Sequence, residues 1–367
     1  MSIDTHVDPV RIEVRAGSRS SSVLIGEGLS DRLRPLLDSA RVGGRRFIVS
    51  NPIVWKFHGP AIERAVEPAQ VVLIPDGERN KALQTVARIY EALIRAEADR
   101  GSMIVAVGGG VVGDVAGFAA ATYLRGIAVA HVPTTLLAQV DSSIGGKVGV
   151  NHQLGKNLIG AFHQPAVVVI DPLLLRTLPR REFRSGLYEV VKYGIIANRD
   201  LFDRLVRDTK AIFNHDPAVL LPVIADSCRI KADVVTADER ESGPRRVLNF
   251  GHTVGHALEA VTKYRRFRHG EAIAYGMLAA ANLAVVRGAL ADREREAIAS
   301  LIAKLGPLPP VVDLSISEVL EAVRRDKKVV NGRLHFVLCI GIGATAVVDD
   351  VSENELTQTL RHIGLQN

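Results

Sequence analysis

Residues 103–114 read MIVAVGGGVVGD, and this stretch decides the fold. Five apolar residues predict a buried strand, and the glycine run after them predicts a tight turn into a helix. Gly108, Gly110 and Gly113 satisfy the GxGxxG pattern, in which backbone N–H groups and a helix N-terminus favour a pyrophosphate. The acidic residue that usually binds ribose about 20 residues further on is missing. The motif therefore indicates a nucleotide-binding turn, with a plain strand-to-helix turn as the alternative.

Strands and helices alternate on both sides of this turn. Helical spacing over LQTVARIYEALIRAEA separates short stretches that predict strands, namely VRIEV, RRFIVSN, VVLIP, IAVAHVP and AVVVID. Such alternation predicts a largely parallel sheet with helices on its faces. We therefore expect an N-terminal α/β domain of Rossmann-like, nucleotide-binding type over residues 1–179.

The pattern changes in the second half of the chain. Residues 181–305 show long helical patterns, and a proline-rich stretch at 307–310 ends them. SISE at 315–318 predicts a capping box for a further helix, and the cations of RRDKK at 324–328 complement its dipole. A short β pair, LHFVLCI and ATAVVDD, precedes the final helix. We predict a mainly α-helical C-terminal domain over residues 180–367 that binds metal and substrate, with the ligand between the domains.

Composition narrows the class of protein. The 367 residues are 47% hydrophobic, which suffices for a substantial core in two domains. The N-terminal stretch lacks the apolar run of a secretory signal, and the charge-free helical run at 272–286 is shorter than the roughly 20 residues of a membrane span. Cys228 and Cys339 lie far apart in apolar surroundings, as expected in a reducing compartment. We expect a cytoplasmic protein without membrane association, in which any metal is bound by His and carboxylate ligands.

The formal net charge is +6, which raises the question of a nucleic-acid partner. The basic residues are scattered in short groups, however, and only 5% of residues are aromatic and able to stack on bases. A charged, solvated surface explains most of this charge. The functional interpretation that remains is an anionic small-molecule substrate, with no nucleic acid bound.

Two lysine-containing segments extend the candidate site. Residues 139–147 read QVDSSIGGK and residues 155–157 read GKN, and their composition predicts loops rather than helix. Lysines supply point charges for phosphate or carboxylate, and Asn supplies a neutral donor. Solvated loop lysines are the ordinary alternative.

A histidine-rich segment indicates metal binding. Residues 249–256 read NFGHTVGH, and a helix there would place His252 and His256 on one face, a spacing that suits a metal. The Glu of a HExxH metalloprotease is absent between them, which disfavours a peptidase. Glu189 is a third candidate ligand, because it forms a charged pair with Lys192 inside an otherwise apolar helical pattern. Buried structural histidines and an ordinary surface ion pair are the alternatives.

Taken in order, these motifs closely resemble those of the 3-dehydroquinate synthase family, the sugar-phosphate cyclases of the shikimate pathway. The resemblance runs from DGERNK at 76–81 to RDKK at 325–328, and VDSSIGGK, GKNLIGAF, ADERE and LNFGHTVGH make it specific. It implies a carbon–oxygen lyase that uses NAD and one divalent metal, zinc or cobalt. It also implies a homodimer that acts on a small phosphorylated sugar acid.

The resemblance assigns roles to individual residues. The metal would be bound by Glu189, His252 and His269, so that His256 faces the substrate instead of pairing with His252. The NAD site would comprise Asn51, Asp76, Gly77, Glu78, Arg79, Asn80, Lys81, Gly110, Val111, Val112, Gly113, Asp114, Thr134, Thr135, Lys147, Lys156, Leu174, Leu175, Arg176 and Thr177. The substrate pocket would comprise Asp141, Lys147, Asn157, Lys192, Lys231, Glu241, Arg245, Asn249, His256 and one of Lys327 and Lys328. Arg125 would reach the neighbouring subunit's site.

The implied reaction converts 3-deoxy-D-arabino-heptulosonate 7-phosphate into 3-dehydroquinate and phosphate. Bound NAD⁺ would oxidise a secondary alcohol, and the metal would bind vicinal hydroxyls and polarise that oxygen as a Lewis acid. The new ketone would acidify the adjacent C–H, so that phosphate leaves by elimination. NADH would return the hydride, and ring opening and aldol closure would form the carbocycle.

Two features depart from the family pattern. Tyr188 stands where the family usually has a small residue, and the arginine-rich stretch at 264–268 is unusual. The nearest alternative function is a sister cyclase for a sugar phosphate without a carboxylate, but such relatives typically alter Asn249 and His256, which match here. A metal-dependent alcohol dehydrogenase that releases NADH and a basic nucleic-acid-binding protein are the more distant alternatives.

Overall fold

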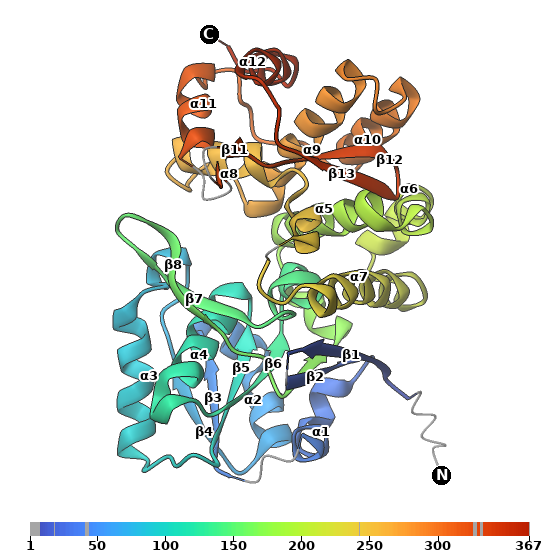
Figure 1. The fold of residues 1–367 in the computed structure, drawn as a ribbon. Helices are drawn as coiled ribbons and strands as arrows, with labels where there is room; N and C mark the ends of the chain where they lie inside the picture. Colours follow the sequence, from blue (N-terminus) through green and yellow to red (C-terminus); the bar gives the residue numbers. More distant parts are fainter. Residues whose placement is uncertain are drawn as a thin grey trace. The chain divides into compact units, whose positions relative to one another are not determined.

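The computed structural model describes residues 8–17, 19–40, 44–241, 243–325, 329–330 and 333–366 (Figure 1). The chain forms two compact units. Unit 1 comprises Met1–Pro179 and His215–Arg240, and unit 2 comprises Arg180–Asn214 and Glu241–Asn367. The sequence pattern placed every residue after 179 in one domain. The structure differs at His215–Arg240, because the helix in this segment packs on the first strand of unit 1.

Unit 1 is built on a seven-stranded sheet with the strand order β1-β2-β9-β6-β5-β3-β4. Its strands are β1 (Val10–Ala16), β2 (Arg19–Ile25), β3 (Arg46–Ser50), β4 (Ala69–Leu73), β5 (Met103–Gly108), β6 (Ala128–Pro133) and β9 (Val167–Ile170). β1 and β2 pair antiparallel, and the other neighbouring pairs are parallel. The largely parallel sheet confirms the predicted α/β class. β2 reads RSSSVLI, and its serines concealed it from a search for apolar runs.

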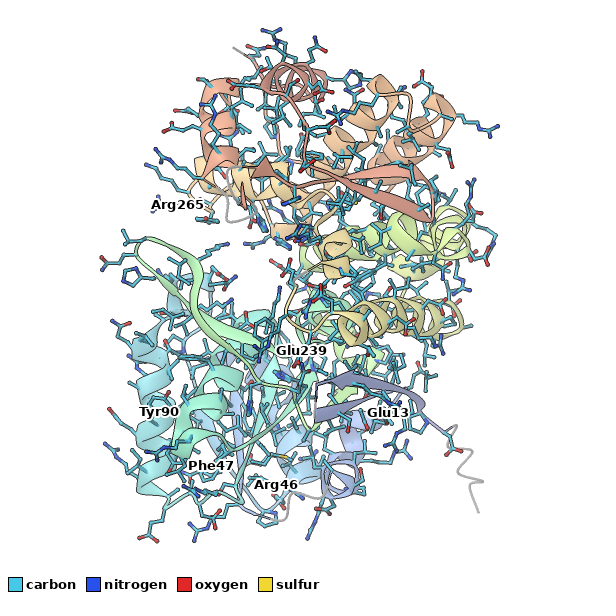
Figure 2. The ribbon with its side chains drawn as sticks, viewed as in Figure 1. Glu13, Arg46, Phe47, Tyr90, Glu239 and Arg265 are labelled. Atoms are coloured by element: carbon cyan, nitrogen blue, oxygen red, sulfur yellow. The ribbon has the colours of Figure 1, made fainter. Side chains whose placement is uncertain are left out.

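Helices cover both faces of this sheet: α1 (Leu33–Ser39), α2 (Pro52–Val66), α3 (Leu83–Arg95) and α4 (Gly110–Thr122). Successive strand residues point to opposite faces. Phe47 of β3 therefore packs in the core with Tyr90 of α3, whereas its neighbour Arg46 donates to the Val66 carbonyl of α2 at 3.3 Å (Figure 2). Ile104 and Val105 of β5 likewise belong to different cores. Burial on both faces explains the near-continuous apolar strands.

The remaining elements of unit 1 carry several predicted site residues. They are η1 (Leu29–Arg32), η2 (Glu78–Asn80), η3 (Tyr123–Arg125), the π-helix η4 (Ala138–Ser142), the hairpin of β7 (Lys147–His152) and β8 (Gly155–Phe162), η5 (Pro172–Thr177) and α7 (Pro217–Ala237). The prediction of loops at 139–147 and 155–157 is therefore wrong in part, because η4 covers residues 139–142, Lys147 begins β7 and residues 155–157 begin β8. Val148 and Val150 alternate with exposed or small residues and pack into the α3–α4 core, which makes this segment a strand.

Unit 2 is mainly helical, as predicted. Its helices are α5 (Arg180–Ala197), α6 (Arg199–Phe213), η6 (Pro244–Asn249), α8 (His252–Val261), α9 (His269–Val286), α10 (Asp292–Leu305), α11 (Ile316–Arg324) and α12 (Glu353–His362). Its short strands are β10 (Val329–Val330), β11 (Arg333–Leu334), β12 (Phe336–Gly341) and β13 (Ala344–Val348). α9 is central, because α5, α8, α10, α12 and β12 all pack on it. Most of its residues from Gly270 to Ala284 are buried, which confirms the predicted core helix.

The cap predicted for α11 is absent. Ser315 stands at the N-cap position, but its hydroxyl contacts Ser317 Oγ at 2.7 Å and makes no cap hydrogen bond. A capping box forms instead at α12, between Ser352 and Glu355. No helix among the described residues is long and apolar enough to cross a membrane. Both cysteines are buried and free.

Candidate nucleotide site and metal centre

The strand order of unit 1 reverses between β3 and β5, because the chain runs outward from β3 to β4 and then returns to β5. In open parallel sheets, ligands bind at the carboxyl ends of the strands at such a reversal. Asn51 directly follows β3, and Gly108 ends β5. The Ser50 hydroxyl of β3 donates to the Val107 carbonyl of β5 at 2.8 Å and joins the two strand ends. The glycine turn therefore lies where a nucleotide is expected.

The glycine turn packs tightly against the segment after β6. A Cβ on Gly109 would lie 3.0 Å from the Thr135 methyl, and one on Gly110 would lie 3.1 Å from Ser142 Oγ. The Thr134 N–H donates to the Gly108 carbonyl at 3.0 Å. The turn thus brings Thr134 and Thr135, both predicted to bind NAD, against the N-terminus of α4. That N-terminus offers backbone N–H groups to an anion.

The DGERNK segment is joined to the same edge. Asn51 Nδ2 donates to Asp76 Oδ1 at 2.8 Å, and Asn80 Nδ2 donates to the Asp76 carbonyl at 2.6 Å. The buried Lys81 ammonium pairs with Asp114 of α4. Burial raises the pKa of the Asp114 carboxyl, although the Lys81 charge acts to lower it. Hydrogen bonds and an ion pair therefore link several of the residues predicted for NAD.

The β7–β8 hairpin contacts this segment. Lys81 Nζ donates to Asn157 Oδ1 at 2.5 Å, and Lys156 Nζ lies 3.9 Å from Glu78 Oε1. Asn157, predicted for substrate, thus contacts a residue predicted for NAD. Asn151 of β7 adds a further contact between the hairpin and this segment, because its Nδ2 donates to Glu78 Oε1 at 2.8 Å. Arg79, on the same segment, is exposed, as is Lys147 at the start of β7.

Some predicted NAD residues belong to the core. The side chains of Val112, Leu174 and Leu175 are buried. Any contact of these three with a dinucleotide would therefore use the backbone. Arg176 and Thr177 are exposed.

Asp141 and Lys231 meet in unit 1. Asp141 lies on the π-helix η4, and Lys231 Nζ of α7 donates to Asp141 Oδ1 at 2.6 Å. Short π-helical segments are frequent at functional sites. Arg125 is exposed at the end of η3, where it and Leu124 have the left-handed φ angles 69° and 49°.

Three residues of unit 2 form a candidate metal centre. Glu189 comes from α5, and His252 and His269 are the first residues of α8 and α9. One potential ligand atom from each lies within 4.8 Å of the others. Glu189 Oε1 lies 3.8 Å from His252 Nε2 and 3.4 Å from His269 Nε2. One carboxylate oxygen and two imidazole nitrogens fit zinc or cobalt.

The two histidines are oriented through their other ring nitrogens. His252 Nδ1 lies 3.1 Å from the Phe250 carbonyl, and His269 Nδ1 lies 3.3 Å from Glu259 Oε2. Donation from Nδ1 leaves Nε2 of each ring as the ligand atom towards Glu189. Burial lowers the pKa of His269, but the Glu259 and Glu189 carboxylates outweigh it and raise the pKa to about 10. The same negative charge favours a divalent cation.

His256 and Lys192 lie beside this centre. The ring centroids of His256 and His252 are 5.3 Å apart, and His256 also forms a second possible ligand group with Glu259 and His269. Lys192 pairs with Glu189, and both side chains are almost fully buried. The alternative of an ordinary surface ion pair is therefore wrong.

Glycines let the three ligand-bearing helices touch. A Cβ on Gly270 of α9 would lie 1.9 Å from the Ser185 carbonyl of α5, and one on Gly276 would lie 1.7 Å from the Gly251 carbonyl before α8. The Gly270 N–H also donates to Ser185 Oγ at 3.0 Å. The backbone spacing that brings the three ligands together therefore depends on the missing side chains.

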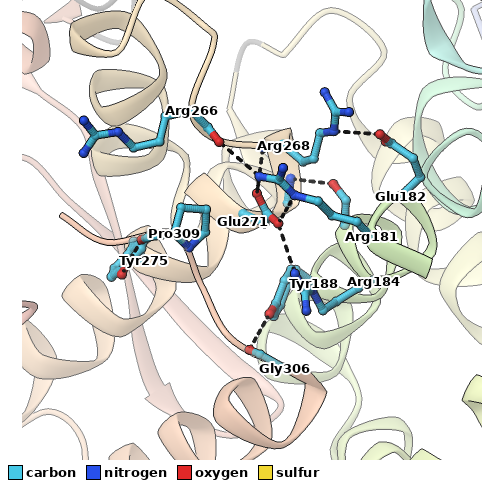
Figure 3. A network of polar contacts seen from close by, with 12 residues as sticks. Arg181, Glu182, Arg184, Tyr188, Arg266, Arg268, Glu271, Tyr275, Gly306 and Pro309 are labelled. Carbon is cyan, nitrogen blue, oxygen red and sulfur yellow. Dashed lines mark hydrogen bonds and ion pairs between the residues drawn. The ribbon is translucent and has the colours of Figure 1, made fainter. Parts of the chain in front are cut away.

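A buried carboxylate strengthens the contact between α5 and α9 (Figure 3). Glu271 is fully buried and accepts from Arg181 Nε at 2.8 Å and from Arg181 Nη2 at 2.7 Å. Arg184 Nη2 donates to it at 3.3 Å, and the Arg268 N–H donates at 2.9 Å. Glu271 therefore holds the first turn of α9, which contains His269, against α5.

The two departures from the family pattern are accommodated around this network. The hydroxyl of Tyr188 donates to the Gly306 carbonyl at 3.4 Å, and burial raises its pKa to about 12 (Figure 3). Arg266 makes two hydrogen bonds to Asp313, each 2.6 Å long. Arg268 Nε lies 2.6 Å from Glu182 Oε1. Carboxylates of unit 2 thus pair with Arg266 and Arg268 of the arginine-rich stretch.

The remaining predicted substrate residues of unit 2 lie on or near η6. Asn249 Nδ2 donates to Glu241 Oε1 at 2.6 Å, and Arg245 is buried. Lys327 and Lys328 lie outside the described residues.

Sequence reasoning missed Glu259 and Glu271. Each is a carboxylate in an otherwise apolar stretch of a helix, in HALEAV and HGEAIAYG. A buried carboxylate needs a partner, so this pattern was a usable signal.

These features define an α/β enzyme with a candidate divalent-metal centre in its helical unit. Comparison with protein families identifies the class further. Residues 71–185 match the family model of the 3-dehydroquinate synthase N-terminal domain, and residues 186–329 match that of the C-terminal domain. A 3-dehydroquinate synthase from Pelotomaculum thermopropionicum is 47% identical over 95% of each chain. The chain belongs to the 3-dehydroquinate synthase family.

Solved structures agree with this fold. The 2-epi-5-epi-valiolone synthase of Streptomyces hygroscopicus, solved with NAD⁺ and Zn²⁺ bound, has a TM-score of 0.87 and 28% identity, covering 95% of this chain and 98% of its own. A 2-deoxy-scyllo-inosose synthase complexed with carbaglucose-6-phosphate, NAD⁺ and Co²⁺ has a TM-score of 0.84 and 26% identity, covering 96% and 100%.

Proposed function

We propose that this protein is a 3-dehydroquinate synthase, which converts 3-deoxy-D-arabino-heptulosonate 7-phosphate into 3-dehydroquinate and phosphate. The observation that carries the proposal is the cluster of buried Glu189 with partly buried His252 and His269, in a chain 47% identical to a 3-dehydroquinate synthase over nearly its full length. NAD and one Zn²⁺ or Co²⁺ would serve as cofactors. The structural neighbours with NAD⁺ and a metal bound support this choice.

The cofactors supply hydride transfer and Lewis-acid polarisation when bound. Glu189, His252 and His269 would hold the metal. The glycine turn and the DGERNK segment would hold NAD, with backbone N–H groups of α4 on its pyrophosphate. NAD would be regenerated within each turnover, so we expect no net accumulation of NADH.

The basic residues that the family resemblance assigns to the substrate would bind its anionic groups. Lys192 and Arg245 are buried in unit 2, and Lys231 is buried in unit 1 beside Asp141. Cations with little exposure to water bind phosphate or carboxylate more strongly than cations on the surface. They would orient the substrate for oxidation and elimination.

A sister cyclase is the nearest competing function. The two solved neighbours make products other than 3-dehydroquinate, but their identity to this chain is 26–28%, against 47% for the 3-dehydroquinate synthase relative. Asn249 and His256 match the dehydroquinate-forming pattern, which supports a substrate with a carboxylate.

The direct test uses the metal-loaded protein, catalytic NAD⁺ and 3-deoxy-D-arabino-heptulosonate 7-phosphate. Stoichiometric phosphate and 3-dehydroquinate, without lasting NADH absorbance, are expected. Phosphate release only from a sugar phosphate without a carboxylate would assign a sister cyclase. Net accumulation of NADH would indicate an alcohol dehydrogenase.

Arg245→Ala should weaken substrate use while the metal stays bound. Loss of a charge-assisted contact costs roughly 1.5–3 kcal/mol, which corresponds to a fall in kcat/KM of about 10- to 100-fold. Steady-state kinetics and metal analysis check this result. Arg246→Ala is the matched control, since Arg246 is the next residue on η6 and is only partly buried. An unchanged kcat/KM for Arg245→Ala would remove Arg245 from the site.

We also propose that the protein is a cytoplasmic homodimer in which Arg125 serves the partner's site. Arg125→Ala and His269→Ala subunits, each inactive alone, should regain activity when co-expressed, because one site of each hybrid dimer is intact. Activity of the purified hybrid measures this. If Arg125 acted within its own subunit, co-expression would restore nothing.

A further inference from the structure

Glu259 is a buried carboxylate that neither the family resemblance nor the comparisons assign. It lies on α8, one turn after His256, and is 5% exposed. Its neighbours in the helix are apolar, Ala257, Leu258, Ala260 and Val261. Burying an ionised carboxylate is costly unless it binds a proton donor or a cation. Its position therefore calls for a specific partner.

That partner is His269. Glu259 Oε2 lies 3.3 Å from His269 Nδ1, on the opposite side of the ring from Nε2, which lies 3.4 Å from Glu189 Oε1. The imidazole thus lies between two carboxylates, one at each nitrogen. An Nδ1–H that donates to Glu259 leaves the Nε2 lone pair directed at the metal centre.

The other histidine is held in a different way. His252 Nδ1 contacts the Phe250 carbonyl, which is neutral and belongs to the same segment of chain. His269 is held by a charged group from another helix. A carboxylate on the far nitrogen also makes the ligand nitrogen more basic. His269 therefore depends on a side chain that substitution can remove, whereas the contact of His252 cannot be removed in this way.

We propose that Glu259 is a positioning residue of the metal centre, which accepts the Nδ1–H of His269 and so directs Nε2 at the ion. The inference rests on the metal centre proposed above. Glu259 would thus bind a metal ligand through a hydrogen bond and would contact neither the metal nor the substrate directly. Outer partners of this kind typically contribute 10- to 100-fold to metal affinity.

Two substitutions separate charge from hydrogen bonding. Glu259→Gln keeps an acceptor oxygen of the same reach and removes the negative charge, whereas Glu259→Ala removes both. Glu355→Gln is the matched control, because Glu355 is also a carboxylate of unit 2 that accepts from a side-chain N–H, that of Arg287 at 2.7 Å, but contacts no predicted ligand. Circular dichroism and thermal unfolding establish that each variant is folded.

The experiment measures Zn²⁺ affinity by chelator competition and the visible spectrum of the Co²⁺-substituted full-length protein. Glu259→Ala is expected to lower affinity by about 10- to 100-fold and to change the Co²⁺ spectrum. Glu259→Gln should lie between Glu259→Ala and wild type in both readouts, and Glu355→Gln should match wild type. If Glu259→Ala is unfolded, the reduced affinity and altered spectrum of Glu259→Gln carry the test.

Wild-type affinity and spectrum in both Glu259 variants would overturn the inference, even if their thermal stability fell. That result would leave the metal centre itself intact. Failure of the wild-type protein to bind Zn²⁺ or Co²⁺ would instead remove the centre and with it the proposed function. The two failures are therefore distinguishable.

Discussion

His269→Ala is expected to lose bound metal and turnover together. In the proposed metal centre His269 supplies one of the three ligand atoms, and Glu189 and His252 alone cannot complete a site of three protein ligands. The loss of metal affinity should exceed the roughly 100-fold that a lost outer partner causes. Metal content by elemental analysis and phosphate release from the same sample measure both effects. Full activity in a metal-free His269→Ala protein would contradict the assignment.

His256→Ala is the informative comparison for this prediction. The spacing of the histidines favours a His252–His256 pair, whereas the family resemblance places His256 at the substrate. If the resemblance is right, His256→Ala keeps its metal and loses turnover. Loss of metal from His256→Ala and retention in His269→Ala would restore the pairing that spacing suggests.

Glu271→Ala should destabilise unit 2 more than any surface substitution. The change leaves the guanidinium of Arg184, whose side chain is 17% exposed, without its carboxylate, although Arg181 remains half exposed and can be solvated. Removing one partner of such a partly buried ion pair lowers the free energy of unfolding by roughly 3 kcal/mol. Chemical denaturation of the wild type and variant gives the difference in unfolding free energy.

Glu355→Ala is the control for this measurement. Glu355 is the third residue of α12 and accepts from the N–H before that helix, as Glu271 does in α9, and it pairs with Arg287, but both side chains of this pair are about one-fifth exposed. Glu355→Ala should therefore lower the free energy of unfolding by less than Glu271→Ala does, by about 1 kcal/mol. An equal or smaller effect for Glu271→Ala would mean that the network in Figure 3 contributes little to stability.

The effect of Glu271 should also depend on pH. Burial acts to raise its pKa, but the hydrogen bonds from Arg181 and the Arg268 N–H outweigh burial and hold the pKa below its usual value. A carboxyl whose pKa is lowered by folding stabilises the protein above its unfolded pKa, near 4.3, and loses that contribution as the pH falls through its folded pKa. The difference in stability between wild type and Glu271→Gln should therefore shrink in acid.

The sequence predicted the sheet well because its strands are buried on both faces and are continuously apolar. It missed β2, in which three serines follow Arg19, and the β7–β8 hairpin, whose glycines indicate loops. It also placed α7 in the second domain. The helical pattern of α7 is clear from sequence, but its packing on β1 is a contact between segments about 200 residues apart.

In the candidate site, too, the sequence did not reveal contacts between separate segments of the chain. Local spacing identified His252 and His256, which are one helical turn apart, but not the ligand group of Glu189, His252 and His269. That group depends on backbone contacts of α5, α8 and α9 at Gly270 and Gly276. Only the family resemblance supplied it. Glu271 pairs with Arg181, 90 residues away in the sequence, and Glu259 contacts a histidine of the next helix, so both partners became visible only in the structure.

The placement of α7 has a consequence for biosynthesis. A growing chain leaves the ribosome from its N-terminus, so β1 is made more than 200 residues before the helix that covers it. Segment 180–214 of the other unit emerges in between. Unit 1 therefore cannot finish folding before residue 240 has been synthesised. A gene divided at codon 179 would encode a first polypeptide that lacks part of unit 1, and a second that contains all of unit 2 together with a segment belonging to unit 1.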